Sequence, residues 1–81
     1  MNDQGLSFGE FLKFRRKKAG LTLEQLAAKV GSSKGYMHDL ENGRFCNPSL
    51  TLAYKLSVVL KTSVKKLAEL AMAEISWDAS K

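Results

Sequence analysis

Hydrophobic residues recur along the chain at intervals of three and four, which is the spacing of one face of an α-helix. Five such sets occur: Phe8, Phe11 and Leu12; Leu23, Leu26, Ala27 and Val30; Met37 and Leu40; Leu52, Ala53, Leu56, Val59 and Leu60; and Val64, Leu67, Ala71 and Ile75. No segment shows the strict alternation of a strand. Each apolar face is too narrow to hold a helix alone, so the five segments must pack on one core.

Polar residues and glycines mark the ends of the predicted helices. Two pairs have the spacing of a capping box, in which side chain and backbone at the helix start bond reciprocally: Ser7 with Glu10, and Thr22 with Gln25. Three further serines precede a periodic segment, and three glycines follow one: Ser33, Ser49 and Ser63; Gly20, Gly31 and Gly43. The sequence therefore predicts an all-α, five-helix bundle with helices over residues 8–18, 23–30, 34–41, 50–60 and 64–75.

Size and charge narrow the class of protein. With 81 residues the chain fits one domain, and its formal net charge of +5 favours a polyanionic partner. Charge alone fits nucleic acid and a membrane surface equally well. No apolar run approaches the roughly 18 residues that span a bilayer, and the first residues lack the pattern of a signal peptide. The single cysteine, Cys46, forms no intrachain disulfide, so we expect a cytoplasmic protein.

The second and third predicted helices are joined by a very short link. Only Gly31-Ser32-Ser33 separates them. A link of this length with glycine first is typical of a helix-turn-helix, in which two helices meet at a steep angle. By itself the link is equally compatible with an ordinary bend in a helical bundle.

Several motifs in a fixed order carry a more specific signal. The run from Gly20 to Gly31 reads GLTLEQLAAKVG, LENGR follows at residues 40–44, and NPS follows at 47–49. Together they resemble the Cro and lambdoid-repressor family of helix-turn-helix proteins, from about Leu12 to Leu67. The resemblance implies a DNA-binding regulator, commonly dimeric, whose third helix enters the major groove of double-stranded DNA.

The resemblance assigns the base-reading positions to the third helix: Ser33, Lys34, Gly35, His38 and Asp39. Helical geometry also turns these positions away from the apolar Met37 and Leu40. Lys34 can donate to guanine, His38 can donate or accept, and Asp39 can accept from a cytosine amino group. A solvated helix face remains the alternative for His38 and Asp39, and a phosphate contact the alternative for Lys34.

Other positions match phosphate contacts or structural residues of the family. The expected phosphate contacts are Thr22, Leu23, Tyr36, Asn42, Arg44 and Asn47. At Thr22 and Leu23 the contact would come from free amides at the helix start, since many relatives carry glutamine where this chain has Leu23. Tyr36 is equally compatible with packing. Arg16 and Glu41 match a partly buried ion pair between the first and third helices.

The basic run at residues 13–18 ends the first helix, where cations complement the helix dipole, and we expect it to lie near DNA. Beyond the core the chain continues with apolar residues: Ala71, Met72, Ile75 and Trp77. We expect these four either to form a dimer interface or to cover the core. The expected division is a short arm over residues 1–7, a DNA-binding domain over 8–70, and an interface segment over 71–81.

Nothing in the sequence indicates an enzyme. One histidine and one cysteine cannot build a usual zinc site, no nucleotide-binding motif is present, and Ser63 of the isolated Ser-x-x-Lys pattern is better explained as a helix cap. We expect no cofactor, metal, membrane or small-molecule ligand. The predicted function is a repressor or regulator that binds a palindromic operator as a homodimer. An antitoxin or adaptor whose main partner is another protein is the alternative.

Overall fold

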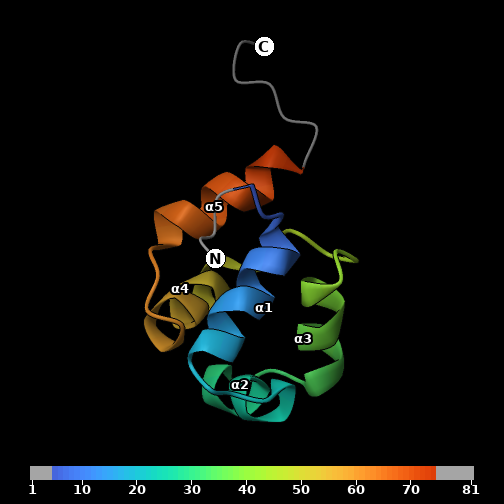
Figure 1. The fold of residues 1–81 in the computed structure, drawn as a ribbon, viewed down its shortest axis with the longest axis vertical. Coiled ribbons are helices and arrows are strands. Elements are labelled where there is room, and N and C mark those ends of the chain that lie inside the picture. The colour runs from blue at the N-terminus through green and yellow to red at the C-terminus, as the bar shows by residue number, and fades with distance from the viewer. Residues whose placement is uncertain (1–4, 75–81) are drawn as a thin grey trace.

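The computed structural model describes residues 5–74, and within that span α-helix is the only regular secondary structure. The helices are α1 (Phe8–Lys18), α2 (Leu23–Val30), α3 (Lys34–Glu41), α4 (Leu50–Val59) and α5 (Val64–Ala73) (Figure 1). The predicted all-α, five-helix fold is confirmed. α1, α2 and α3 have the predicted bounds, whereas α4 ends one residue earlier because Leu60 is its C-cap. α5 ends at Ala73, and the predicted end at Ile75 lies outside the described residues.

The predicted caps explain where the helices begin. Both capping boxes form: at α1 the Glu10 amide donates to the Ser7 hydroxyl over 3.2 Å, and the Ser7 amide donates to the Glu10 carboxylate over 2.9 Å. The hydrogen bonds from the Ser7 amide and then the Ser7 hydroxyl lower the pKa of Glu10. The three serine N-caps also form. At the helix ends, Gly20, Gly31 and Gly43 adopt the left-handed backbone that glycine tolerates best.

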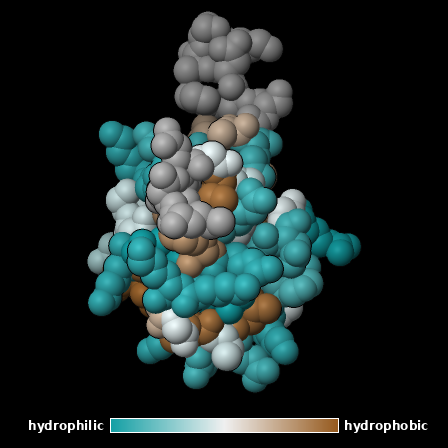
Figure 2. All heavy atoms as spheres, in the orientation of Figure 1, coloured by the Kyte–Doolittle hydropathy of each residue, from teal (hydrophilic) through white to brown (hydrophobic). Residues whose placement is uncertain are grey.

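One core holds the helices together. α1 runs through the middle of the molecule, with α3 and α5 against it, while α2 packs on α3 and α4 (Figure 1). The buried apolar residues come from every helix: Phe8, Phe11, Leu12, Leu26, Ala27, Val30, Met37, Leu40, Leu56, Leu60, Leu67 and Ala71. The face in Figure 2 is correspondingly mostly hydrophilic, with apolar atoms showing between the polar ones. No helix within residues 5–74 is long and apolar enough to cross a membrane.

α1 and α3 approach closely at Gly9, which is buried. A Cβ atom built on this residue would lie 2.4 Å from the backbone oxygen of Glu41 and 2.6 Å from that of Leu40. Contacts this short cannot be accommodated without moving backbone. Gly9 therefore sets the distance between the first helix and the third.

Two side chains tie the ends of other helices to α1. The Phe8 amide, in the first turn of α1, donates to the Glu74 carboxylate at the end of α5 over 2.6 Å. The Arg15 guanidinium donates to the carbonyl oxygens of Leu60, at 2.9 and 3.2 Å, and of Lys61, at 3.0 Å. These bonds satisfy backbone groups that every helix end leaves without an intrahelical partner.

Candidate nucleic-acid interface

The short link between α2 and α3 has the geometry of a helix-turn-helix. Gly31 ends α2 with a left-handed backbone (φ 68°), and the Ser32 amide donates back to the Ala27 carbonyl over 2.8 Å. Ser33 then caps α3 by accepting the Tyr36 amide over 3.1 Å. Because both ends of the link are fixed by hydrogen bonds, the orientation of α3 relative to α2 is fixed as well.

α3 is amphipathic. Met37 and Leu40 are fully buried, which anchors the helix on the core. The five predicted base-reading residues lie on its other side, where all are exposed except the half-buried Asp39: Ser33, Lys34, Gly35, His38 and Asp39. The structure thus brings these residues onto one surface, presented by a rigid helix.

Lys34 and His38 each lie near a carboxylate. The Lys34 amino group lies 3.3 Å from the Glu24 carboxylate, and the two side chains are 60% and 74% exposed. His38 Nδ1 lies 3.9 Å from the Asp39 carboxylate. Exposed pairs of this kind contribute about 0–1 kcal/mol, so Lys34 can leave Glu24 for a stronger acceptor at little cost. The sequence reasoning missed Glu24, although both residues lie in the first turn of helices joined by a short link.

The segment after α3 combines hydrogen bonds to α3 with exposed side chains. Asn42 Nδ2 donates to the His38 carbonyl over 2.7 Å, so this amide closes the end of α3. The Arg44 amide donates to the Asp39 carbonyl over 2.9 Å, while the Arg44 side chain is exposed. Asn47 is also exposed. All three residues expected to contact phosphate here are exposed, but the amide nitrogen of Asn42 already donates to the His38 carbonyl.

An aromatic pair, which the sequence reasoning did not find, supports this segment. The rings of Tyr36 and Phe45 lie 5.7 Å apart between centroids, tilted by 35°. Tyr36 is half-buried, in keeping with the packing alternative, and Phe45 is 41% exposed. Such pairs stabilise their surroundings beyond simple burial. The pair fixes the segment beside α3.

The start of α2 offers backbone donors rather than a side chain. The Thr22 hydroxyl accepts the Gln25 amide over 3.1 Å, whereas the Leu23 and Glu24 amides have no hydrogen-bond partner within residues 5–74. Leu23 itself is half-buried and packs against the core. Free amides at a helix start attract anions. This is the arrangement expected for a phosphate contact made by backbone at Thr22 and Leu23.

Arg16 and Glu41 meet between α1 and α3. Arg16 Nε and Nη2 donate to the two Glu41 carboxylate oxygens over 2.6 and 3.1 Å, and Nη1 donates to the Leu21 carbonyl over 2.8 Å. The side chains are 10% and 4% exposed. The pair is bidentate and buried, so it fixes α3 to α1.

The basic run at the end of α1 has divided roles. Arg15 binds the end of α4 and Arg16 binds Glu41, so both serve the fold. Lys13, Lys17 and Lys18 are exposed. The donors of the two arginines are directed at protein acceptors, and the proximity of the run to DNA stays a prediction.

Part of the expected interface segment belongs to the core. Ala71 is buried at 8% exposure, which favours the core alternative for this residue, whereas Met72 is 36% exposed. Ile75 and Trp77 lie outside the described residues. Met72 lines an apolar groove between α5 and the start of α4, together with Leu50 and Ala68.

A second apolar surface lies on α4. Leu50, Tyr54 and Val58 are 79%, 62% and 59% exposed, and their spacing of four residues places them on one face of the helix. We call these three residues the α4 stripe. The sequence did not lead us to predict the α4 stripe. A signal was present, because a helix that is apolar on most sides is typically covered by other protein on most sides. Leu50 joins the stripe to the groove beside Met72.

A helix-turn-helix held in a five-helix bundle, with an exposed polar face on the second helix of the motif, defines the class of small helix-turn-helix domains. Comparison with known proteins agrees, because the sequence model of the helix-turn-helix family matches residues 12–70. The chain belongs to this family, in its Cro and lambdoid-repressor branch.

Named relatives are transcriptional regulators. The chain is 38% identical to the HTH-type transcriptional regulator SinR of Bacillus subtilis over 61 residues, which are 75% of this chain and 55% of SinR. It is 31% identical to the ImmF control region 10 kDa protein of Bacillus phage phi105, over 86% of this chain and 79% of that protein. The chain spans about half the length of the SinR proteins that it matches.

Solved structures show the same fold. The crystal structure of the biofilm regulator SinR in complex with DNA superposes with a TM-score of 0.70 at 38% identity, covering 75% of this chain and 97% of that chain. The SinR–SinI complex superposes with a TM-score of 0.70 at 34% identity, covering 90% and 69%.

Proposed function

We propose that the chain is a sequence-specific, DNA-binding transcriptional regulator that acts in the cytoplasm and inserts α3 into the major groove. The observation that carries this proposal is the exposed face of α3, on which Lys34, His38 and Asp39 stand over a buried anchor. These side chains offer a donor, an ambivalent group and an acceptor to base edges. The solved complex of the similar SinR domain with DNA supports the same reading.

Contacts to the DNA backbone would position α3 without selecting a sequence. The free amides at Leu23 and Glu24 precede α3 in the chain, and the exposed side chains of Arg44 and Asn47 follow it, so both are candidates for such contacts. A net charge of +5 strengthens this attraction at low ionic strength.

A homodimer completes the proposed function. Each good base contact discriminates by roughly 1–3 kcal/mol, which is too little for one helix to find a single operator in a genome. Two copies related by a two-fold axis would place their α3 helices about 34 Å apart on a palindromic site. We propose that the α4 stripe and Met72 form the interface, with Ile75 and Trp77 of the tail, and that the regulator represses transcription.

The test is a selection of bound sites from random duplex DNA, with the wild type and with His38→Ala and Asp39→Ala. We expect these variants to change the preferred bases, Arg44→Ala to weaken all sites alike, and Lys65→Gln, on exposed α5 surface, to change neither. Unchanged base preferences in both α3 variants would refute the placement of α3.

Sedimentation tests the interface separately. Tyr54→Ser removes an exposed ring, so the monomer should stay folded while the dimer dissociates. A dimer that survives Tyr54→Ser but is lost on Ile75→Ser would assign the interface to the tail alone.

An adaptor function remains the second candidate, because the similar SinR occurs in a complex with the protein SinI. A chain that selects no DNA sequence but binds a protein would favour this candidate.

A further inference from the structure

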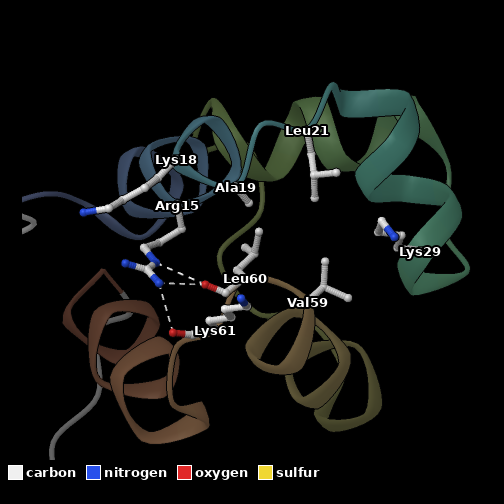
Figure 3. Close-up of a pocket in the computed structure, with 8 residues that line it drawn as sticks. All are labelled: Arg15, Lys18, Ala19, Leu21, Lys29, Val59, Leu60 and Lys61. Atoms are coloured by element: carbon white, nitrogen blue, oxygen red, sulfur yellow. Dashed lines mark hydrogen bonds between the residues drawn. The ribbon is translucent and has the colours of Figure 1, made fainter.

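A basic cleft lies at the junction of α1, α2 and α4, with a volume of about 540 Å³. Figure 3 shows Leu21 and Val59 facing one another across it, with Arg15 bridging α1 and the end of α4 at one side. Leu60 contributes to its floor. The interior of the cleft is therefore apolar, although its edges are charged.

The charged residues that line the cleft are all cationic. Lys18, Lys29 and Lys61 are exposed at its edges, with the Lys18 amino group directed away over the Phe14 ring, and no acidic residue within the described part of the chain lines it. None of the three lysines forms an ion pair with another residue of the span 5–74. Arg15 differs from them, since three of its hydrogen bonds go to backbone carbonyls. The cleft thus keeps a positive potential that the fold itself does not neutralise.

Lys61 adopts a backbone conformation that costs lysine more free energy than it would cost glycine. It has a left-handed backbone, with φ of 55°, and it is the one non-glycine residue of the described chain with a positive φ. Gly20, Gly31 and Gly43 occupy the comparable positions after α1, α2 and α3. Glycine could occupy this position without strain. The presence of lysine is therefore a reason to look for a function of its side chain.

The cleft and the α3 surface lie on opposite edges of α2. Glu24 pairs with Lys34 on the edge next to α3, whereas Lys29 lines the cleft. Five residues of helix separate Glu24 from Lys29, which rotates them apart by about 140°. A ligand in the cleft would therefore leave the α3 surface free.

We propose that this cleft is the docking site for an acidic segment of a protein partner. An apolar side chain of the segment would lie between Leu21 and Val59, and carboxylates on either side of it would meet Lys29 and Lys61. Charge complementarity selects this occupant. Small organic anions are bound by convergent, fixed donors, whereas here the fixed guanidinium serves the backbone and the other cations are flexible lysines set apart along the edges.

The probe is a short synthetic helical peptide with several glutamates around one central leucine, labelled for fluorescence anisotropy. We expect the wild-type chain to bind it, and Lys61→Gln to bind it about two- to five-fold more weakly, the range for one exposed charge pair. Lys13→Gln, an equal loss of charge on exposed α1 surface outside the cleft, should leave the affinity unchanged. Amide chemical shifts should change at Leu21 and Val59.

Lys61→Gly separates binding from folding. The variant relieves the left-handed backbone, so its Tm should rise by about 4 °C while the peptide affinity falls as in Lys61→Gln. Loss of affinity therefore cannot be ascribed to unfolding.

Several outcomes would overturn the proposal. Equal losses in Lys61→Gln and Lys13→Gln would reduce the binding to net charge, as would undiminished binding of a peptide with alanine in place of leucine. Shift changes confined to α3 would place the peptide on the DNA surface. A loss of operator affinity in Lys61→Gln as large as its loss of peptide affinity would assign the cleft to DNA. Peptide binding is measured without DNA, so the peptide results stand whether or not the proposed DNA function holds.

Discussion

Substituting Arg16 by alanine should destabilise the fold more than any change on the α3 surface. The Glu41 carboxylate is 4% exposed and would lose both hydrogen bonds to the guanidinium, at 2.6 and 3.1 Å. Breaking a buried pair by removing one partner costs about 3–5 kcal/mol, because a charge is left buried and uncompensated. Domains of this size are stabilised by about 4–12 kcal/mol in total. Arg16→Ala should therefore remove about a quarter or more of the stability.

Related variants separate the contributions to the loss of stability in Arg16→Ala. Arg16→Lys keeps the charge but cannot donate to both Glu41 oxygens and to the Leu21 carbonyl at once, so its loss should be intermediate. The double variant Arg16→Met with Glu41→Leu removes both charges and replaces them with apolar groups. Such replacements are often neutral, so the double variant should be more stable than either single variant.

Urea denaturation followed by circular dichroism measures these differences as shifts in midpoint at constant slope. A double-mutant cycle then gives the coupling between the two residues. Additive losses in the cycle, or an Arg16→Ala variant within about 0.5 kcal/mol of wild type, would refute the reasoning. Arg44→Ala, an exposed arginine outside the core, is the matched control and should leave stability unchanged.

Three further predictions concern smaller features. Gly9→Ala should destabilise the fold by about 1–3 kcal/mol in the same denaturation assay, because its Cβ would lie 2.4 Å from the Glu41 backbone oxygen. Cys46→Ser should leave operator affinity unchanged, since the thiol is half-buried beside the apolar groove, and an oxidant-sensitive wild type would contradict this. The cap that Glu10 forms with Ser7 should stabilise α1 above the ordinary carboxyl pKa, and this contribution should disappear as the pH falls through the lowered pKa. Thermal melts through the acid range should show that component in the wild type and not in Glu10→Gln.

The fold followed from the sequence because its signals are local. Helix periodicity, capping boxes and glycines at helix ends each act within a few residues, so the bounds of α1, α2 and α3 could be predicted directly. α4 departs from the prediction because the apolar pattern runs through Leu60, whereas the helix ends before it and turns at Lys61. A left-handed lysine has no sequence signal comparable to a glycine.

The candidate site was predictable where the family motif covers it and not where it depends on packing. The exposed side of α3 follows from the burial of Met37 and Leu40, which the spacing indicates. The pair Lys34–Glu24 and the ring pair Tyr36–Phe45 join separate elements or a helix and a loop. Such pairings depend on the angle at which two elements pack. The spacing of residues within one helix does not predict that angle.

The net charge indicates only the class of partner, whereas the structure shows where each cation lies. The excess of cations first indicated a polyanionic partner without saying where that partner binds. In the structure, Arg16 pairs with Glu41 inside the fold, and the Arg15 guanidinium donates to backbone carbonyls at the end of α4. Among the other cations, Lys34 and Arg44 lie at the α3 surface, whereas Lys18, Lys29 and Lys61 line the cleft on the other edge of α2. A single DNA site does not account for both groups, and this division is the physical reason to expect two partners on one small domain.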